Sequence, residues 1–265
     1  MKKIGFTLLS AMLMSQVLFA QATYFAGVSG SVNTVGYTYQ NNYGQTKLGY
    51  DGAQISPFFS LFGGVDFNKS SQLILEASFA NYETKYKDDI TAISTTPLTY
   101  KKEVKLNYFS IPLLYRFVAG AKKASGAKFF LTVGPQFSFL TSASYSLTIA
   151  GANASFTDFA YNPYNLSADA VVTANTNGGT TQPAAKDLYK SSSIDAVFGF
   201  GALFPLSDAV KLSAELRGGY GLGDINADKW HTQGYESKAV VDYKASHSYF
   251  GGLRIGVQYS FSKKK

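Results

Sequence analysis

The C-terminal segment 253–261 alternates strictly between two kinds of residue, and this alternation limits what the chain can fold into. Every second residue is apolar, and these residues are Leu253, Ile255, Val257, Tyr259 and Phe261. The positions between them hold small or polar residues, one of which is the charged Arg254. A period of two predicts a strand with one apolar face and one polar face.

Residues 1–22 have the three parts of a secretory signal peptide. Two lysines give a positive start, an apolar run follows, and Ala20-Gln21-Ala22 fits the small-x-small cleavage pattern. The alternative is an uncleaved anchor, although the run is shorter than the roughly 20 apolar residues of a spanning helix. We therefore predict a signal peptide over 1–22 and one mature domain over 23–265.

An exported chain changes how the alternation is interpreted. In a soluble sandwich the polar face meets water, whereas in a membrane the apolar face meets lipid and the polar face lines a closed barrel. No later stretch is apolar enough for a transmembrane helix, and only helices and closed barrels satisfy every backbone polar group in lipid. Aromatic residues make up 15% of the chain and charged residues only 15%, whereas about a quarter of a soluble domain is charged. The sequence therefore predicts that apolar side chains face lipid and that Arg254 faces the lumen.

Eight segments have the pattern of strands. They are about 23–33, 55–67, 72–82, 103–117, 128–140, 194–206, 210–222 and 254–261. The links after the second, fourth and sixth segments are short, and the long links are roughly 34–54, 83–102, 141–193 and 223–248. This alternation is typical of outer-membrane barrels, with short periplasmic turns and long external loops. We predict an all-β fold, an eight-stranded antiparallel transmembrane up-and-down β-barrel with long external loops and both termini in the periplasm.

Two local features qualify this prediction. The segment 141–193 is rich in Ser, Thr, Ala and Asn, and is interpreted either as an external loop or as an extra hairpin, so ten strands remain an alternative. Pro112 lies inside the fourth predicted strand. Because proline cannot donate a hydrogen bond to a neighbouring strand, we expect a β-bulge there.

Several predicted strands carry motifs of a known family. Leu106-Asn-Tyr-Phe-Ser-Ile-Pro-Leu-Leu-Tyr-Arg-Phe117 resembles the "Y-x-x-I-P-L-L" strand of the PorT-like outer-membrane β-barrel family, and the segments 129–137, 198–206 and 212–220 resemble later strands of that family. The resemblance covers most of the mature chain outside the loops and implies a barrel in the outer membrane of a Gram-negative, Bacteroidota-type envelope. Some members are linked to protein secretion and gliding, but no residue here transfers that role.

The C-terminus also resembles the signal read by the barrel-assembly machinery. The matching residues are Gly256, Tyr259 and Phe261. In many barrel proteins the aromatic residue is the last one, whereas here Ser262 and three lysines follow it. The resemblance implies that the assembly machinery is a partner. The four residues after Phe261 depart from the usual ending, so whether the machinery reads this signal stays open.

Six charged residues occupy positions that the alternation places inside the barrel. They are Glu76, Arg116, Asp195, Glu215, Arg217 and Arg254. Arginine presents a rigid fork of donors that pairs with carboxylates in a confined space. We predict a lumen ion-pair network that fills and rigidifies a small barrel. The alternative is a polar path or a ligand site, since an eight-stranded barrel has room for side chains or for one small ligand.

The remaining candidates for chemistry are weaker. His231 and His247 fall in or near the last external loop with Asp228, Ser246 and Ser248, and this favours solvated loop residues over a catalytic site. Two histidines without cysteine do not make a typical zinc site, the pair Asp88-Asp89 lacks the ligand spacing of a calcium loop, and 175–181 lacks the lysine of a phosphate-binding loop. We therefore predict no metal and no cofactor. A tyrosine cluster in the first external loop is interpreted as an interfacial girdle or loop packing, or else as a binding surface; its members are Tyr37, Tyr39, Tyr43 and Tyr50.

These observations favour a non-enzymatic outer-membrane barrel with a structural or surface-binding role and a lumen filled by side chains. The alternatives are a narrow, porin-like passive channel, a membrane-embedded hydrolase or acyltransferase, and a soluble secreted β-protein. The expected partners are outer-membrane lipid, lipopolysaccharide, the barrel-assembly machinery and a possible external protein or glycan ligand. The net charge of +7 includes no basic stripe, so we expect no nucleic-acid partner.

Overall fold

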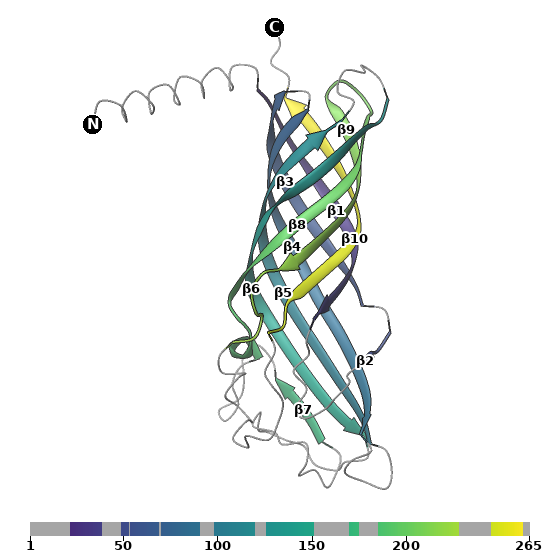
Figure 1. Ribbon diagram of the computed structural model, residues 1–265, viewed down its shortest axis with the longest axis vertical. Coiled ribbons are helices and arrows are strands. Elements are labelled where there is room, and N and C mark those ends of the chain that lie inside the picture. The colour runs from purple at the N-terminus through teal and green to yellow at the C-terminus, as the bar shows by residue number, and fades with distance from the viewer. Residues whose placement is uncertain are drawn as a thin grey trace, which may run out of the picture.

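In the part of the chain that the computed structural model describes, most residues lie in antiparallel strands (Figure 1). The structure describes residues 22–38, 49–52, 54–68, 70–90, 98–119, 126–150, 170–174, 185–227 and 245–261. The strands are β1 (Thr23–Tyr37), β2 (Gly49–Tyr50), β3 (Ile55–Asn68), β4 (Ser71–Ile90), β5 (Leu98–Val118), β6 (Lys128–Ala150), β7 (Ala170–Ala174), β8 (Ser192–Pro205), β9 (Val210–Gly221) and β10 (Ser248–Phe261). A short 3-10 helix spans Ala185–Leu188. No helix within the described residues has the length and hydropathy needed to cross a membrane. The signal peptide predicted over 1–22 lies almost wholly outside the described residues.

The sheet closes on itself into an eight-stranded barrel. The strand order runs β4-β3-β1-β10-β9-β8-β6-β5, and β5 pairs with β4 to complete the ring. All pairings are antiparallel, and β1 joins the N-terminal half to the C-terminal strand β10. Within the described residues, β2 pairs with β4 and β7 pairs with β6, and neither strand enters the ring. The eight-stranded prediction is therefore confirmed.

One end of the barrel carries the short turns, and we call it the turn end. Asn68 accepts a hydrogen bond from the Ser70 amide between β3 and β4, and Ser207 accepts one from the Val210 amide between β8 and β9. Asx and Ser turns of this kind stabilise tight connections. The register pairs Tyr24 near the start of β1 with Phe261 at the end of β10. Both ends of the barrel sequence therefore lie at the turn end.

At the opposite end, β4, β5 and β6 extend beyond the other strands (Figure 1). The segment 83–102, predicted as a loop, is strand over most of its length, so this prediction is wrong. The strands continue because opposite charges face each other across them: Glu83 pairs with Lys105 and Lys85 with Glu103 in the register, and such pairs stabilise a sheet. In the segment 141–193, β6 runs on to Ala150 and pairs with β7, as in the extra-hairpin alternative.

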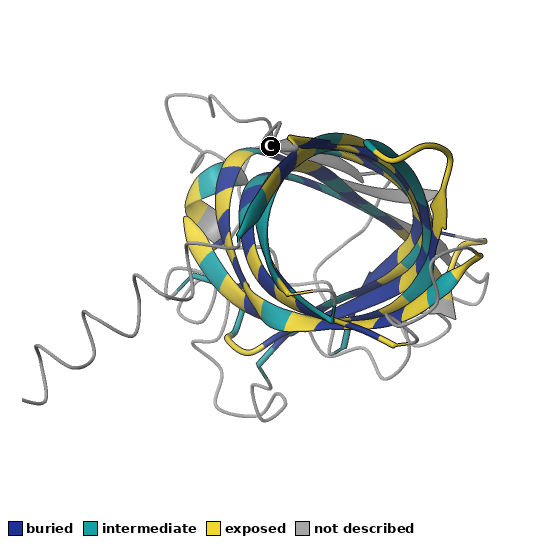
Figure 2. Ribbon diagram, turned by 90° about the horizontal axis from the view of Figure 1, so that it is seen from above, coloured by how far each residue is buried: buried dark blue, intermediate teal, exposed yellow. Residues whose placement is uncertain are grey.

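The strands present two unlike faces, as the alternation predicts. The outer surface is apolar, and its exposed residues include Tyr24, Val28, Phe59, Leu61, Leu75, Phe79, Leu131, Val133, Phe198, Phe200, Leu216, Leu253, Val257, Tyr259 and Phe261. Arg254, by contrast, is 3% exposed. Figure 2 shows the ring from above, with buried and exposed residues alternating along much of the barrel wall. In β4 and β5 the apolar outer face ends beyond Phe79 and Phe109, where outward charges begin.

Small residues inside the barrel make room for aromatic rings. Gly64 lies opposite Phe25, and Gly27 lies opposite Phe62. A Cβ at either glycine would collide with the ring across from it. This pairing of an inward glycine with an inward aromatic packs the lumen next to the barrel wall.

Pro112 does not produce the expected bulge. The β5–β6 register is the same on both sides of Pro112, which pairs with Gln136. The register shift lies instead between Asn107 and Tyr108. Proline removes one hydrogen-bond donor but adds no residue, so the ladder loses a bond there without changing register.

Candidate functional site

Five charged side chains from four strands meet inside the barrel. Glu76 comes from β4, Arg116 from β5, Glu215 and Arg217 from β9, and Arg254 from β10. Their neighbours along each strand, such as Leu75 and Leu216, point outward and are exposed. The two-residue period of the strands therefore directs these charges into the lumen. We call this group the ion-pair cluster.

Glu76 is held by two arginines. Arg217 donates to both of its carboxylate oxygens, from Nη1 at 2.8 Å and from Nη2 at 3.1 Å. Arg254 donates from Nη2 to Oε1 at 2.9 Å. Glu76 is 2% exposed. A two-pronged arginine–carboxylate pair fixes distance and angle together, so this contact locks β9 against β4 across the lumen.

Glu215 lies among all three arginines. Its Oε2 accepts hydrogen bonds from Arg217 Nη2 at 3.0 Å and from Arg254 Nη1 at 3.2 Å. Arg116 Nη2 lies 3.9 Å from the same oxygen. Glu215 is 0% exposed. A buried carboxylate in this position compensates several positive charges at once.

The cluster carries one more positive charge than negative, since three arginines face two glutamates. Arg116 has the longest ion pair of the three. Its Nη1 also donates to Gln72 at 3.2 Å, and its guanidinium lies 4.2 Å from the centre of the Phe130 ring. Among the described residues, its Nε has no hydrogen-bond partner, and the same holds for the Nε atoms of Arg217 and Arg254. Arg116 is therefore the least compensated charge of the cluster.

Asp195, the sixth predicted member, lies apart from the cluster. Its carboxylate accepts hydrogen bonds from Gln136 Nε2 at 3.1 Å, Ser138 Oγ at 3.0 Å and Ser248 Oγ at 3.3 Å. It shares the inward direction of the other five residues but lies four positions before Gly199 in β8, and Gly199 is the residue opposite Arg217. The inward direction of a side chain does not determine its position along the barrel axis.

Aromatic side chains fill the lumen toward the end opposite the turns. Tyr82 is the centre of this group, with ring centroids 5.3 Å from Phe58, 5.6 Å from Tyr108 and 6.4 Å from Phe250. Tyr37 stacks on Tyr82 with centroids 6.4 Å apart. All five rings are buried. We call them the aromatic layer, and together with the ion-pair cluster they occupy the middle of the barrel.

The sequence interpretation missed this layer, although the signal was present. Tyr82 and Tyr108 have the same parity as Glu76 and Arg116 on their strands, which predicts an inward direction. Tyr37, interpreted as a loop residue, ends β1 and is buried. Tyr50 belongs to β2, and its hydroxyl oxygen lies 2.7 Å from the hydroxyl oxygen of Tyr249. Two further tyrosines of the predicted cluster, Tyr39 and Tyr43, lie outside the described residues.

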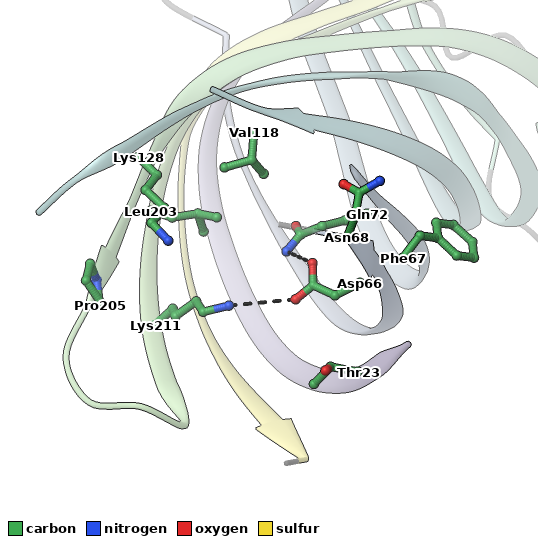
Figure 3. Close-up of a pocket in the computed structure, with 10 residues that line it drawn as sticks. All are labelled: Thr23, Asp66, Phe67, Asn68, Gln72, Val118, Lys128, Leu203, Pro205 and Lys211. Atoms are coloured by element: carbon green, nitrogen blue, oxygen red, sulfur yellow. Dashed lines mark hydrogen bonds and ion pairs between the residues drawn. The ribbon is translucent and has the colours of Figure 1, made fainter. Parts of the chain in front are cut away.

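The turn end contains a cavity of about 420 Å³ (Figure 3). Its wall consists of Thr23, Asp66, Phe67, Asn68, Gln72, Val118, Lys128, Leu203, Pro205 and Lys211. Lys211 Nζ lies 3.7 Å from Asp66 Oδ2, and Gln72 Nε2 donates to Asp66 Oδ1 at 2.7 Å. The sequence interpretation did not single out these residues, because they come from turns and strand ends that meet only when the barrel closes.

The residues considered for catalysis do not form a catalytic arrangement where they are described. His247 stacks on Tyr220 with centroids 5.4 Å apart, and its Nδ1 lies 2.9 Å from the Gly221 carbonyl oxygen. A carbonyl only accepts, so Nδ1 carries the proton. The hydroxyl of Ser248 donates to Asp195 rather than to a histidine. His231 and Asp228 lie outside the described residues.

Within the described ranges, no group of three acidic, histidine or cysteine side chains is arranged to hold a metal ion. The side chains of Asp88 and Asp89 and the segment 175–181 lie outside what the structure describes. Of the C-terminal residues predicted as an assembly signal, Tyr259 and Phe261 point outward with ring centroids 5.3 Å apart. Gly256 is buried, and a Cβ added to it would meet the Ser213 hydroxyl.

Comparison with known proteins gives a family match over most of the chain. The family described as "Outer membrane protein beta-barrel domain" matches residues 19–227. Similar solved structures include a major outer membrane protein from Thermus thermophilus, at 12% identity and a TM-score of 0.39, covering 90% of this chain and 99% of the other. OprG from Pseudomonas aeruginosa has 11% identity and a TM-score of 0.38, covering 91% and 96%. Neisserial surface protein A has 14% identity and a TM-score of 0.36, covering 91% and 99%. No curated protein matches the sequence.

Proposed function

Because this chain belongs to the outer membrane protein beta-barrel domain family, we propose that it is a non-enzymatic barrel of the outer membrane whose lumen is closed by side chains. In this proposal the protein acts as a structural element of the envelope or through its external end. Both termini are periplasmic, the PorT-like subgroup is its place within the family, and its partners are outer-membrane lipid, lipopolysaccharide and an external protein or glycan.

One observation carries the closed-lumen proposal: the ion-pair cluster joins opposite walls of the barrel. Arg217 on β9 reaches Glu76 on β4, although the two residues are 141 positions apart in the chain. Arg254 on β10 reaches the same carboxylate. An eight-stranded barrel has an interior only wide enough for side chains or one small ligand. The cluster and the aromatic layer therefore leave a continuous water path little room.

The closed-lumen proposal predicts silence in planar lipid bilayers. Purified protein refolded in detergent and added to a bilayer is expected to give no reproducible conductance steps, because the ion-pair cluster and the aromatic layer block the lumen. A large-pore porin refolded in the same detergent serves as the positive control. Uniform conductance steps from this protein would instead support the narrow passive channel.

An interaction of the C-terminal strand with the barrel-assembly machinery is a separate part of the proposal. Phe261 is 53% exposed on the outer surface, where an assembly factor has access to it. Phe261→Ala is expected to lower the assembled fraction severalfold in cells or in vesicles containing the machinery, while leaving spontaneous refolding in detergent nearly unchanged. Heat-modifiable gel mobility measures the assembled fraction.

Phe204→Ala is the matched control for this experiment. Phe204 is also an outward aromatic near the turn end, at 39% exposed, but it belongs to β8 rather than to the last strand. If Phe204→Ala and Phe261→Ala lower assembly equally, the C-terminal residues are not a specific signal.

A further inference from the structure

The cavity at the turn end has an excess of positive charge. Among the described residues, its wall carries two lysines, Lys128 and Lys211, and one carboxylate, Asp66. In Figure 3 the two lysines stand across the cavity from Asp66 and Gln72. Asp66 is already engaged, because Gln72 donates to it at 2.7 Å and Lys211 lies 3.7 Å from it. The Asp66 carboxylate therefore compensates the charge of Lys211.

Among the residues that the structure describes, none provides a counter-charge to Lys128. It begins β6 and lines the cavity, and within the described part of the chain it has neither a hydrogen-bond nor an ion-pair partner. The side chain is half-buried. A lysine amine in a concave, partly enclosed site attracts anions more strongly than one on an open surface, because low-dielectric walls focus its field.

The interior behind the cavity adds to this imbalance. Gln72 lines the cavity and accepts a hydrogen bond from Arg116, the least compensated arginine of the ion-pair cluster. That cluster has three arginines and two glutamates, so it contributes a further net positive charge. A buried charge without a counter-charge is costly. An anion in the cavity would offset both charges.

Polar groups near the cavity also lack partners. Gln258 lies opposite Lys211 in the β9–β10 register and is 1% exposed. Within the described ranges, neither its side-chain nitrogen nor its side-chain oxygen has a hydrogen-bond partner. Buried polar atoms in native proteins are normally bonded to protein, water or ligand. The unused amide next to Lys211 is consistent with a bound polar group at this end of the lumen.

We propose that the turn-end cavity binds a phosphate-bearing anion, with Lys128 as the principal contact and Lys211 as the second. The volume of about 420 Å³ holds a small phosphate ester. Val118, Leu203 and Pro205 give one side of the wall an apolar surface suited to a carbon skeleton. This site lies apart from the ion-pair cluster and goes beyond the closed-lumen role. A free phosphate ester and a phospholipid headgroup present the same chemistry to it.

The test is calorimetric titration of the full-length mature protein, refolded in neutral detergent, with inorganic phosphate. Wild-type protein is expected to bind phosphate, and Lys128→Gln is expected to weaken this binding about tenfold, because it removes a charge-assisted hydrogen bond to the anion. Lys211→Gln should weaken binding less, because Lys211 is shared with Asp66. Lys190→Gln is the control, because Lys190 is an exposed lysine near the opposite end of the barrel.

A second arm distinguishes the two sources of phosphate. Native mass spectrometry measures retention of phosphatidylglycerol by wild type and by Lys128→Gln. Binding of inorganic phosphate that depends on Lys128 supports a free phosphate ester. Retention of phosphatidylglycerol that depends on Lys128, without binding of inorganic phosphate, supports a lipid headgroup. The proposal is overturned if neither ligand binds, or if Lys190→Gln weakens binding as much as Lys128→Gln.

Discussion

Replacing Glu215 with alanine is expected to lower the free energy of unfolding by about 3–5 kcal/mol. Glu215 is completely buried and compensates Arg217, Arg254 and Arg116. Its loss leaves three buried arginines with Glu76 alone, and an uncompensated buried charge costs far more than the net contribution of the intact pair. Urea unfolding in detergent, followed by heat-modifiable gel mobility, measures the change.

Two further variants separate charge from packing. Glu215→Gln keeps the shape of the side chain but removes its charge, so it should show most of the same loss. Glu103→Ala removes a glutamate that pairs with Lys105 at 2.8 Å and is 36% exposed, and exposed ion pairs contribute less than about 1 kcal/mol. If Glu215→Ala is no more destabilising than Glu103→Ala, the ion-pair cluster does not stabilise the barrel.

The direction of side chains was predictable because it depends only on local geometry. If 253–261 is a strand, its period of two places Arg254 on the face opposite Tyr259 and Phe261. In the structure Arg254 is buried, whereas Tyr259 and Phe261 are exposed. The same rule placed Arg116 and Arg217 inside. No knowledge of the neighbouring strands is needed for this step, since alternate residues of any strand point to opposite faces.

The partners of each inward residue were not predictable in the same way. Glu76 and Arg217 meet across the lumen from β4 and β9, and their heights depend on the tilt and stagger of all the strands in the closed ring. Asp195 shows the consequence, because it has the predicted direction but a different height. The turn-end cavity was not predictable for the same reason, since Lys128 and Asp66 line one cavity only when the barrel is closed.

Apolar alternation does not predict the extension of β4 and β5. Beyond Phe79 and Phe109 the outward positions become charged, and a charged segment between apolar runs is typical of a loop. The strands continue there through cross-strand ion pairs, with Lys105 Nζ 3.6 Å from Glu83 Oε1. The change from apolar to charged outward residues therefore marks the edge of the apolar surface rather than the end of the strands.

Replacing Leu61 with arginine is expected to destabilise the barrel in lipid by about 2–4 kcal/mol. Leu61 lies in the middle of β3, and its side chain is 65% exposed on the apolar outer surface. Its register neighbours Val28 and Ala77 give it no polar partner. In a membrane the arginine is placed near the centre of the hydrocarbon, where its charge is poorly solvated. Equilibrium unfolding from phospholipid vesicles measures the effect.

Leu206→Arg provides the comparison that depends on depth. Leu206 is 63% exposed, almost the same fraction as Leu61, but it lies in the β8–β9 region at the turn end. An arginine near the interface reaches water and headgroups, so its cost should fall to about 0–1 kcal/mol. A soluble barrel would tolerate both substitutions equally, since both positions would face water. Equal costs for the two variants would therefore contradict a lipid-facing outer surface, whereas a large cost only at Leu61 requires one.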